Sequence, residues 1–369
     1  MPKSVEPDRW LFGATVALCL IGTIMVFSAS AITSRIRFGN PYFFLTRELA
    51  WLAIGGVGML VLARMDYRIL RRPLVAYAGM AASLVLLVAV FALDKSHLTH
   101  RWIRIGSLGF QPAEFAKLAV IFYLAWFLEL RSSPQGPGIN DPLRSLLPGF
   151  APVFLIAGLV LLEPDMGTAA ELVLIALVMF FVAGLSWRWV AAAIAVGIPA
   201  LFLAIRMAPH RYERLKAFLH PSANPQGHSF QLFQSLIGVG SGGIFGVGLM
   251  EGRQKLFYLP DAHTDFIFSV IVEELGLIGG IVVLLLLAIY AWRAVRVVWN
   301  SPDGFGRMAA LGITAMVAGQ ALINLSVVLG MVPTKGIPLP FVSYGGSSLV
   351  VMLLGTGVLL NISQQASPQ

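Results

Sequence analysis

Long apolar runs recur along the whole chain and are separated by short polar segments. Most of these runs approach the roughly 20 residues that an α-helix needs to cross the hydrocarbon core of a bilayer. They lack the apolar-polar alternation that marks the strands of a membrane barrel. The pattern therefore predicts ten membrane-spanning helices, at about 10–31, 49–63, 74–93, 113–130, 149–162, 168–185, 189–205, 266–292, 308–329 and 349–362.

Composition supports an all-α integral membrane protein. Apolar residues make up 57% of the chain and charged residues only 12%, whereas soluble domains carry about 25% charged residues. No soluble domain or internal repeat is evident, so we expect a single polytopic membrane domain over 1–369. The only cysteine, Cys19, lies inside the first apolar run, which excludes a disulfide framework or a Cys-x-x-Cys metal site.

The distribution of basic residues predicts that both ends of the chain are cytoplasmic, because Lys and Arg collect in loops that stay inside. The same rule explains the net charge of +8 without a nucleic-acid partner. The long segment 206–265, between the seventh and eighth predicted helices, then lies outside. The basic residues of the inner segments are Lys3, Arg9, Arg64, Arg68, Arg71, Arg72, Arg131, Arg144, Arg188, Arg293, Arg296 and Arg307; those of the short outer loops are Arg35, Arg37, Arg47, Lys95, Arg101, Arg104 and Lys335.

An acidic stretch just before the eighth predicted helix is the first candidate site. Asp261, His263 and Asp265 follow one another at alternate positions. A carboxylate here could accept a proton from a hydroxyl group or hold a divalent cation. The alternative is that Thr264 and Asp265 cap the helix that follows. Glu273 and Glu274, about two turns further on, are interpreted as buried structural acids or as outward-facing charges.

A second candidate lies within the fourth predicted helix. Glu114 and Lys117 are three residues apart and share a helix face. Ionisable groups inside a membrane span are functional candidates by default, and Lys117 could neutralise a phosphate. The alternative is an ion pair whose two members satisfy each other and fix helix packing.

Three other outer segments carry possible binding groups. Asp165 lies in a tight turn and either binds a ligand or caps the sixth predicted helix. The glycine-rich run 238–243 fits Gly-x-Gly-x-x-Gly, but no strand precedes it, so close packing against other helices is expected instead of a dinucleotide site. The segment 333–348 either binds an anion at the start of the last helix, beside Lys335, or forms a rigid re-entrant turn.

Five motifs together resemble the SEDS family. They are Pro164–Thr168, Pro221–Pro225 with Gln231 and Gln234, Leu259–Phe266, Glu273–Gly276 and Pro340–Ser348. They occur in order over nearly the whole chain. The run Pro333–Gly336 resembles the FtsW division branch more than the RodA elongation branch or the sporulation member SpoVE.

The resemblance implies a ten-helix peptidoglycan glycosyltransferase of the bacterial cytoplasmic membrane, which polymerises lipid II at the outer face during septal cell-wall synthesis. It also implies a class B penicillin-binding protein as transpeptidase partner, together with other division proteins and membrane lipid. The family's essential carboxylate corresponds to Asp265, and its acid and lysine pair corresponds to Glu114 and Lys117. Asp261 stands where many members have Glu.

This chemistry assigns roles to the outer residues. Asp265 would act as general base or as ligand of a divalent cation, Mg²⁺ or Mn²⁺, and no organic cofactor is expected. Positive groups would stabilise the departing lipid pyrophosphate. The residues expected to bind substrate are Glu114, Lys117, Arg101, Asp165, His263, Lys335 and Ser343.

Other functions remain open at this point. Ten spans with buried charges would also suit a transporter that flips lipid II across the membrane, although such transporters often have repeated halves and need sites at both faces. A RodA-type elongation polymerase is a further alternative. A scaffold that only recruits division proteins would leave Glu114 and Lys117 without a purpose.

Overall fold

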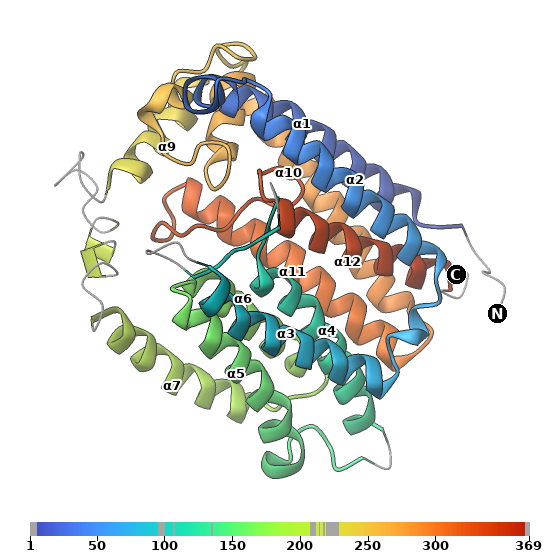
Figure 1. Ribbon diagram of the computed structural model, residues 1–369. Helices are drawn as coiled ribbons and strands as arrows, with labels where there is room; N and C mark the ends of the chain where they lie inside the picture. Colours follow the sequence, from blue (N-terminus) through green and yellow to red (C-terminus); the bar gives the residue numbers. More distant parts are fainter. Residues whose placement is uncertain are drawn as a thin grey trace.

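The computed structural model describes residues 6–94, 100–105, 108–133, 136–206, 212, 213, 215, 216, 218 and 229–365. This part of the chain is almost wholly helical (Figure 1). The main helices are α1 (Arg9–Phe38), α2 (Phe43–Arg64), α3 (Pro73–Leu93), α4 (Pro112–Arg131), α5 (Leu147–Leu162), α6 (Met166–Val182), α7 (Trp187–Arg206), α9 (Phe230–Ser241), α10 (Ile267–Asn300), α11 (Gly304–Val328) and α12 (Gly346–Gln364). Short helical turns η1 (Tyr67–Ile69), η2 (Pro142–Leu146) and η3 (Gln254–Tyr258) join them, and β1 (Ile103–Ile105) pairs antiparallel with β2 (Leu108–Phe110).

Each of the ten predicted apolar ranges coincides with a helix of the structure. Among the described residues, seven helices are long and apolar enough to cross a membrane: α1, α2, α3, α5 together with η2, α10, α11 and α12. The helix α6 and the apolar part of α7 are shorter, and α4 carries Glu114, Lys117, Glu129 and Arg131. The prediction of an all-α membrane protein is confirmed.

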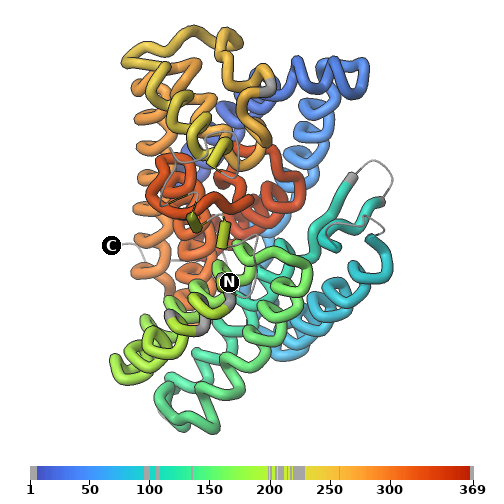
Figure 2. The backbone as a smooth tube through the Cα atoms, turned by 90° about the vertical axis from the view of Figure 1, so that its left-hand side faces the viewer, coloured from blue at the N-terminus to red at the C-terminus, as the bar shows by residue number. Residues whose placement is uncertain are grey.

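The last helix, α12, forms the centre of the bundle. Buried residues make up 89% of its apolar window, and Figure 2 shows the red C-terminal part surrounded by other segments. Helix α2 lies beside it (Figure 1), and glycines allow the close approach. A Cβ added at Gly357 would lie 2.5 Å from the carbonyl oxygen of Met59. Side chains at this contact would force the two helices apart.

The described part of the segment before α10 includes helical structure. It contains α9 and η3. The motif Pro221–Pro225 of this segment lies outside the described residues, as does Lys95 after α3. A Cβ at Gly242 would lie 1.9 Å from the carbonyl oxygen of Val272, and one at Gly246 would lie 2.2 Å from that of Glu274. Within the run 238–243, the prediction of close packing against a helix is confirmed for Gly238 and Gly242, whereas a Cβ at Gly240 or Gly243 would have nothing within 4 Å.

Glu273 and Glu274 are buried structural acids, one of the two predicted interpretations. Glu273 accepts hydrogen bonds from the backbone N–H groups of Arg253 and Gln254. Glu274 forms a buried ion pair with Lys255, with 2.7 Å between Nζ and Oε1, and accepts a hydrogen bond from Ser28. Both carboxylates thus fasten η3 to α10, just before the acidic stretch.

The segment between α11 and α12 enters the bundle. A Cβ at Gly22 would lie 2.7 Å from the carbonyl oxygen of Phe341. Helix α1 has 30 residues and is about 45 Å long at 1.5 Å per residue, so Gly22 lies near its midpoint. Residues 333–345, here called the re-entrant segment, thus carry polar backbone into the interior of the bundle, which supports the predicted turn. Anion binding beside Lys335 stays a prediction.

Candidate functional site

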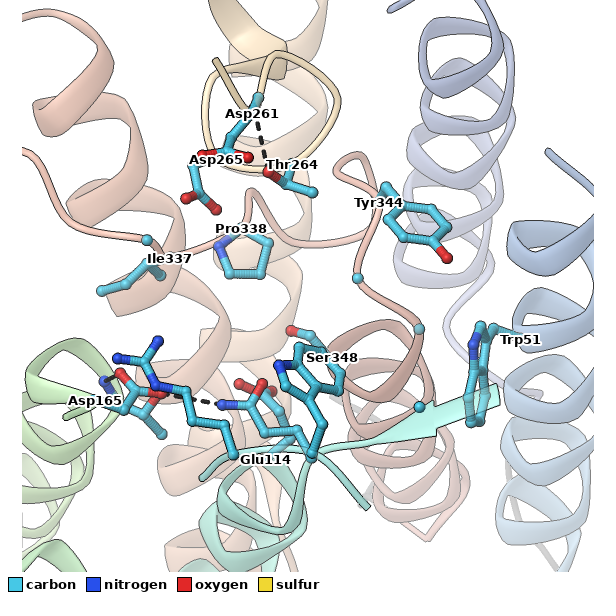
Figure 3. Close-up of a pocket in the computed structure, with 18 of the residues that line it drawn as sticks. Trp51, Glu114, Asp165, Asp261, Thr264, Asp265, Ile337, Pro338, Tyr344 and Ser348 are labelled. Carbon is cyan, nitrogen blue, oxygen red and sulfur yellow. Dashed lines mark hydrogen bonds between the residues drawn. The ribbon is translucent and has the colours of Figure 1, made fainter. Parts of the chain in front are cut away.

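Two adjoining cavities meet beside the acidic stretch. The smaller cavity has a volume of about 410 Å³ and the larger a volume of about 660 Å³. Both are lined by one set of residues, here called the shared wall: Arg101, Asp165, Asp261, Asp265, Gly336 and Ile337. In Figure 3, Asp261 and Asp265 lie on one side of the smaller cavity, and Asp165 and Glu114 lie on the other. Carboxylates therefore face each other across this space.

Asp265 is held through its backbone. Its carbonyl oxygen accepts a 2.8 Å hydrogen bond from Nδ2 of Asn324 on α11. The residue that caps α10 is Phe266, and the helix start has no side-chain cap hydrogen bond. The alternative that Thr264 and Asp265 cap this helix is therefore wrong. Instead, Thr264 donates its hydroxyl and N–H to the carbonyl oxygen of Asp261 and closes the turn locally.

Asp165 does cap a helix, as the alternative interpretation predicted. Its carboxylate accepts hydrogen bonds from the N–H of Thr168 at 3.1 Å and from the Thr168 hydroxyl at 2.8 Å. It accepts a third, at 3.0 Å, from Nε2 of Gln111. Arg101 donates from Nε to the carbonyl oxygen of Glu163 at 2.8 Å, and its guanidinium also donates to that of Pro164. The turn before α6 thus fixes two groups of the shared wall.

Glu114 and Lys117 form the predicted ion pair, with 2.9 Å between Oε2 and Nζ. Lys117 also lies 3.1 Å from Oε2 of Glu171 on α6 and donates a 2.8 Å hydrogen bond to Oε1 of Gln320 on α11. Lys117 is 0% exposed, whereas Glu114 and Glu171 line the smaller cavity. Sequence reasoning missed Glu171, although an acid inside the sixth predicted helix is the signal that drew attention to Glu114.

The remaining predicted residues occupy different positions. Lys335 lines the larger cavity, but His263 and Ser343 line neither. The His263 ring packs against Phe44 and Tyr344, and burial, helped by the charge of Arg37, lowers its pKa to about 4. The Ser343 hydroxyl accepts a hydrogen bond from the N–H of Leu339. In this geometry His263, Ser343 and Lys117 support the wall without lining it, and direct substrate contact by them stays a prediction.

The smaller cavity has aromatic residues that sequence reasoning did not select. Trp51 of α2, Trp102 and Tyr344 all contribute to its lining, and Figure 3 shows Trp51 and Tyr344 on the side of α2. Aromatic rings combine flat apolar faces with polar edges. Nothing in an apolar run distinguishes a cavity-lining tryptophan from one that faces lipid, so the sequence held no signal for Trp51.

Glu163 is a buried acid next to the shared wall. It is 0% exposed, and neither of its carboxyl oxygens has a hydrogen-bond partner among the described residues. Burial, and secondly the charge of Asp165, raise its pKa to about 8, while Arg101 acts in the opposite direction. This carboxyl is therefore protonated near neutral pH.

Carboxylates are the main candidates to hold a divalent cation at this site. Among the described residues, no group of three or more His, Cys, Asp or Glu side chains is arranged to hold a metal ion. Mg²⁺, however, is commonly bound by one or two carboxylates together with substrate phosphates. Asp265 and Asp261 line the same cavities and fit that second arrangement.

A bundle of apolar helices around a polar, two-part cavity defines an integral membrane protein with a buried hydrophilic site. The sequence profile of the FtsW/RodA/SpoVE family of cell cycle proteins matches residues 9–368. The chain belongs to this family.

Individual relatives agree with that assignment. The probable peptidoglycan glycosyltransferase FtsW of Trichlorobacter lovleyi is 41% identical over 98% of this chain and 94% of its own length. The stage V sporulation protein E of Bacillus subtilis is 40% identical over 98% of both chains.

Solved structures show the same fold. A chain from work on the structural coordination of polymerization and crosslinking by a peptidoglycan synthase complex superposes with a TM-score of 0.76, at 30% identity over 97% of both chains. The rod shape determining protein RodA of Thermus thermophilus gives 0.72, at 28% identity over the full length of both.

Proposed function

We propose that this chain is a peptidoglycan glycosyltransferase of the FtsW type, which polymerises lipid II for septal cell-wall synthesis. The observation that carries the proposal is the position of Asp265 at the junction of two cavities. A glycosyl transfer between two lipid-linked sugars needs two adjacent binding places with a proton acceptor between them. The name of the Trichlorobacter lovleyi relative supports this activity.

In this mechanism Asp265 is the general base. The acceptor sugar hydroxyl attacks the anomeric carbon of the donor, and its proton passes to the Asp265 carboxylate. The bond between the anomeric carbon and the pyrophosphate oxygen breaks, and the lipid pyrophosphate leaves with the electron pair. A single displacement converts an α-linked donor into a β-linked product. Arg101 and Lys335, which line the larger cavity, stabilise the charge that develops on the leaving group.

The larger cavity is the better place for the leaving group. Besides Lys335, its lining includes apolar residues of α6 and α11, namely Met166, Ala170, Leu322 and Ile323. An apolar wall with a cation suits a lipid pyrophosphate. The smaller cavity, with Trp51, Trp102 and Tyr344, suits sugar rings.

Asp265 and Asp261 would be the residues to hold a divalent cation, Mg²⁺ or Mn²⁺, if Asp265 acts as a cation ligand instead of the general base. Asp261 would supply a second carboxylate from the same turn. Such a cation would neutralise charge on the phosphoryl oxygens of the leaving group.

We propose ten membrane crossings with both ends cytoplasmic and the cavities in the outer half of the membrane. The distribution of Lys and Arg supports this orientation, whereas exposed tryptophans only mark where helices meet a membrane interface, because aromatic residues gather at both interfaces. Trp10, Trp187, Trp292 and Trp299 are all well exposed and lie at helix ends that the arginine distribution assigns to the inside.

We further propose that the protein works with a class B penicillin-binding protein and other division proteins. A chain that superposes on this one belongs to a peptidoglycan synthase complex that coordinates polymerization and crosslinking. The crosslinking activity is expected from that partner.

To test this proposal, the purified protein is reconstituted with its partner and given labelled lipid II, in detergent to measure polymer and in sealed vesicles to measure lipid movement. The proposal expects glycan polymer in detergent. Lipid II movement across sealed vesicles without any polymer, from protein with a cooperative thermal transition, would support the flippase instead.

A further inference from the structure

Two amides on one face of α11 connect the buried lysine to the acidic stretch. Gln320 and Asn324 are four residues apart and therefore neighbours on the helix surface. Both are buried, at 0% and 1% exposed. We propose that Gln320 and Asn324 are positioning residues, which hold the Asp265 turn and the re-entrant segment in register with Lys117. This inference rests on the proposed glycosyltransferase activity for its catalytic consequence.

The orientation of Gln320 is set by its partners. Lys117 can only donate hydrogen bonds, so the amide oxygen of Gln320 must face it, at 2.8 Å. The NH₂ group then points toward the re-entrant segment and donates to the carbonyl oxygen of Pro338 at 2.9 Å and to the Ser348 hydroxyl at 3.2 Å. Gln320 thus ties Lys117 to both ends of the turn that leads into α12.

Asn324 makes the second connection. Its Nδ2 donates to the carbonyl oxygen of Asp265 at 2.8 Å and to that of Ile337 at 2.7 Å. The two N–H bonds of one amide therefore join the Asp265 turn to the re-entrant segment. Gly336, next to Ile337, lies so close that an added Cβ would be 3.0 Å from Oδ2 of Asp265. The position of the Asp265 carboxylate is then defined relative to α11.

This chain of contacts explains how Lys117 can matter without touching substrate. Glu114 and Glu171 hold the ammonium from α4 and α6, and the ammonium orients Gln320 on α11. A 1 Å misplacement of a reacting group costs on the order of 100-fold in rate. A loss of either amide is therefore expected to appear in catalysis as well as in stability.

The chain offers a matched control at the other end of the bundle. Asn361 of α12 is also buried, and its Nδ2 also donates to two backbone carbonyl oxygens, those of Ala63 and Met65. It fastens α12 to the end of α2 by the same kind of hydrogen bonds, but it lies on none of the cavity walls. Asn361→Leu should therefore cost stability without moving Asp265.

The experiment compares Asn324→Leu, Asn324→Asp and Asn361→Leu in the full-length protein with its partner and labelled lipid II, at equal amounts of folded protein. For Asn324→Leu the expected result is a kcat lowered about 100-fold, with KM within about threefold of the native value. Asn324→Asp keeps the size but loses the donors, so it should be equally impaired. Asn361→Leu should keep the native kcat. Equal kcat values in Asn324→Leu and Asn361→Leu, or a native kcat in Asn324→Asp, would overturn the inference.

Hydrogen exchange of the same variants gives a readout that does not depend on activity. Asn324→Leu should speed exchange together in 259–266 and 333–345, whereas Asn361→Leu should speed it near 63–67 only. If the native protein forms no polymer, the proposed function is wrong, but the hydrogen-exchange comparison still tests the positioning role of Asn324. Unchanged exchange in both outer segments of Asn324→Leu would refute that role.

Discussion

At the scale of single residues, Asp165 and Asp265 share one cavity wall but are held in different ways. The Asp165 carboxylate caps α6 and accepts a hydrogen bond from Gln111. The backbone carbonyl of Asp265 accepts a hydrogen bond from Asn324, and the residue that caps α10, Phe266, makes no side-chain cap hydrogen bond. Asp265 is the better candidate for chemistry because the Asp165 carboxylate already caps α6 and accepts a hydrogen bond from Gln111.

Glu163 gives a prediction for the pH dependence of stability. Its pKa is raised to about 8 in the folded protein, above the value of about 4.3 for a free glutamate. Between these values the unfolded chain loses the proton and the folded chain keeps it, so the free energy of unfolding falls as pH rises through this window. Glu163→Gln removes this dependence, because the amide does not titrate.

We expect Glu163→Gln to raise the thermal unfolding temperature relative to the native protein above pH 8, with the difference shrinking toward pH 5. Thermal scans in detergent at several pH values measure it. A difference that is constant with pH would show that the Glu163 carboxyl is charged throughout.

Lys117 gives a second residue-scale prediction. Lys117→Met leaves Glu114 and Glu171 buried without their counter-ion, and breaking a buried ion pair in this way costs about 3–5 kcal/mol. Adding Glu114→Gln and Glu171→Gln to Lys117→Met should recover a large part of that loss, since no unpaired charge remains. Unfolding of the single and triple variants in denaturant tests this, and equal stability of the two would contradict it.

At the scale of elements, the helices were predictable and their contacts were not. Apolar runs identified every long helix because burial in lipid leaves little choice of residue. Glu114 and Lys117 stood out because ionisable groups are rare inside an apolar run, and Asp265 stood out as part of the acidic stretch before α10. The contact between Lys117 and Gln320 spans 203 residues, and no local pattern encodes which turns of two helices will meet.

The depth of the re-entrant segment illustrates the same limit. Its prolines and glycines predicted a turn, but only the contact of Phe341 with Gly22 shows how far it enters. His263 was selected as part of the acidic stretch and Ser343 as part of the segment 333–348, yet the His263 ring packs against Phe44 and the Ser343 hydroxyl accepts a hydrogen bond from backbone. Polarity in an apolar sequence thus predicts involvement at a site without specifying contact with a ligand.

Two glycines test the docking of α9 on α10. A Cβ at Gly242 would meet the Val272 backbone at 1.9 Å, whereas a Cβ at Gly240 would have nothing within 4 Å. Gly242→Ala should therefore lower the unfolding temperature and speed proteolysis before α10, because backbone atoms cannot move aside cheaply. Gly240→Ala should be neutral or slightly stabilising, since Ala favours helix by about 1 kcal/mol. Equal behaviour of the two variants would contradict the observed packing.

At the scale of the whole molecule, the two polar cavities lie at one end of the helix bundle. The distribution of Lys and Arg supports the proposal that this end faces outward. Cys19 is the only cysteine and is buried, so single cysteines can be introduced without a strong background.

Phe245→Cys and Arg307→Cys test this orientation. Phe245 is 80% exposed between α9 and η3, and Arg307 lies near the start of α11. In intact cells, a thiol reagent that does not cross membranes should label the first variant and leave the second unlabelled until the cells are opened. The reverse pattern would invert the proposed topology.

The most direct test of the central claim compares Asp265→Asn with Asp303→Asn in lipid II polymerisation. Asp303 is a carboxylate at the opposite end of the bundle, where it caps α11 and accepts a hydrogen bond from Tyr67. With equal amounts of folded protein and the same partner, Asp303→Asn should form polymer at the native rate. The polymerisation rate of Asp265→Asn should be about 100- to 10,000-fold lower, which is the usual contribution of a general base. Polymer at the native rate from Asp265→Asn would contradict the assignment of the catalytic base.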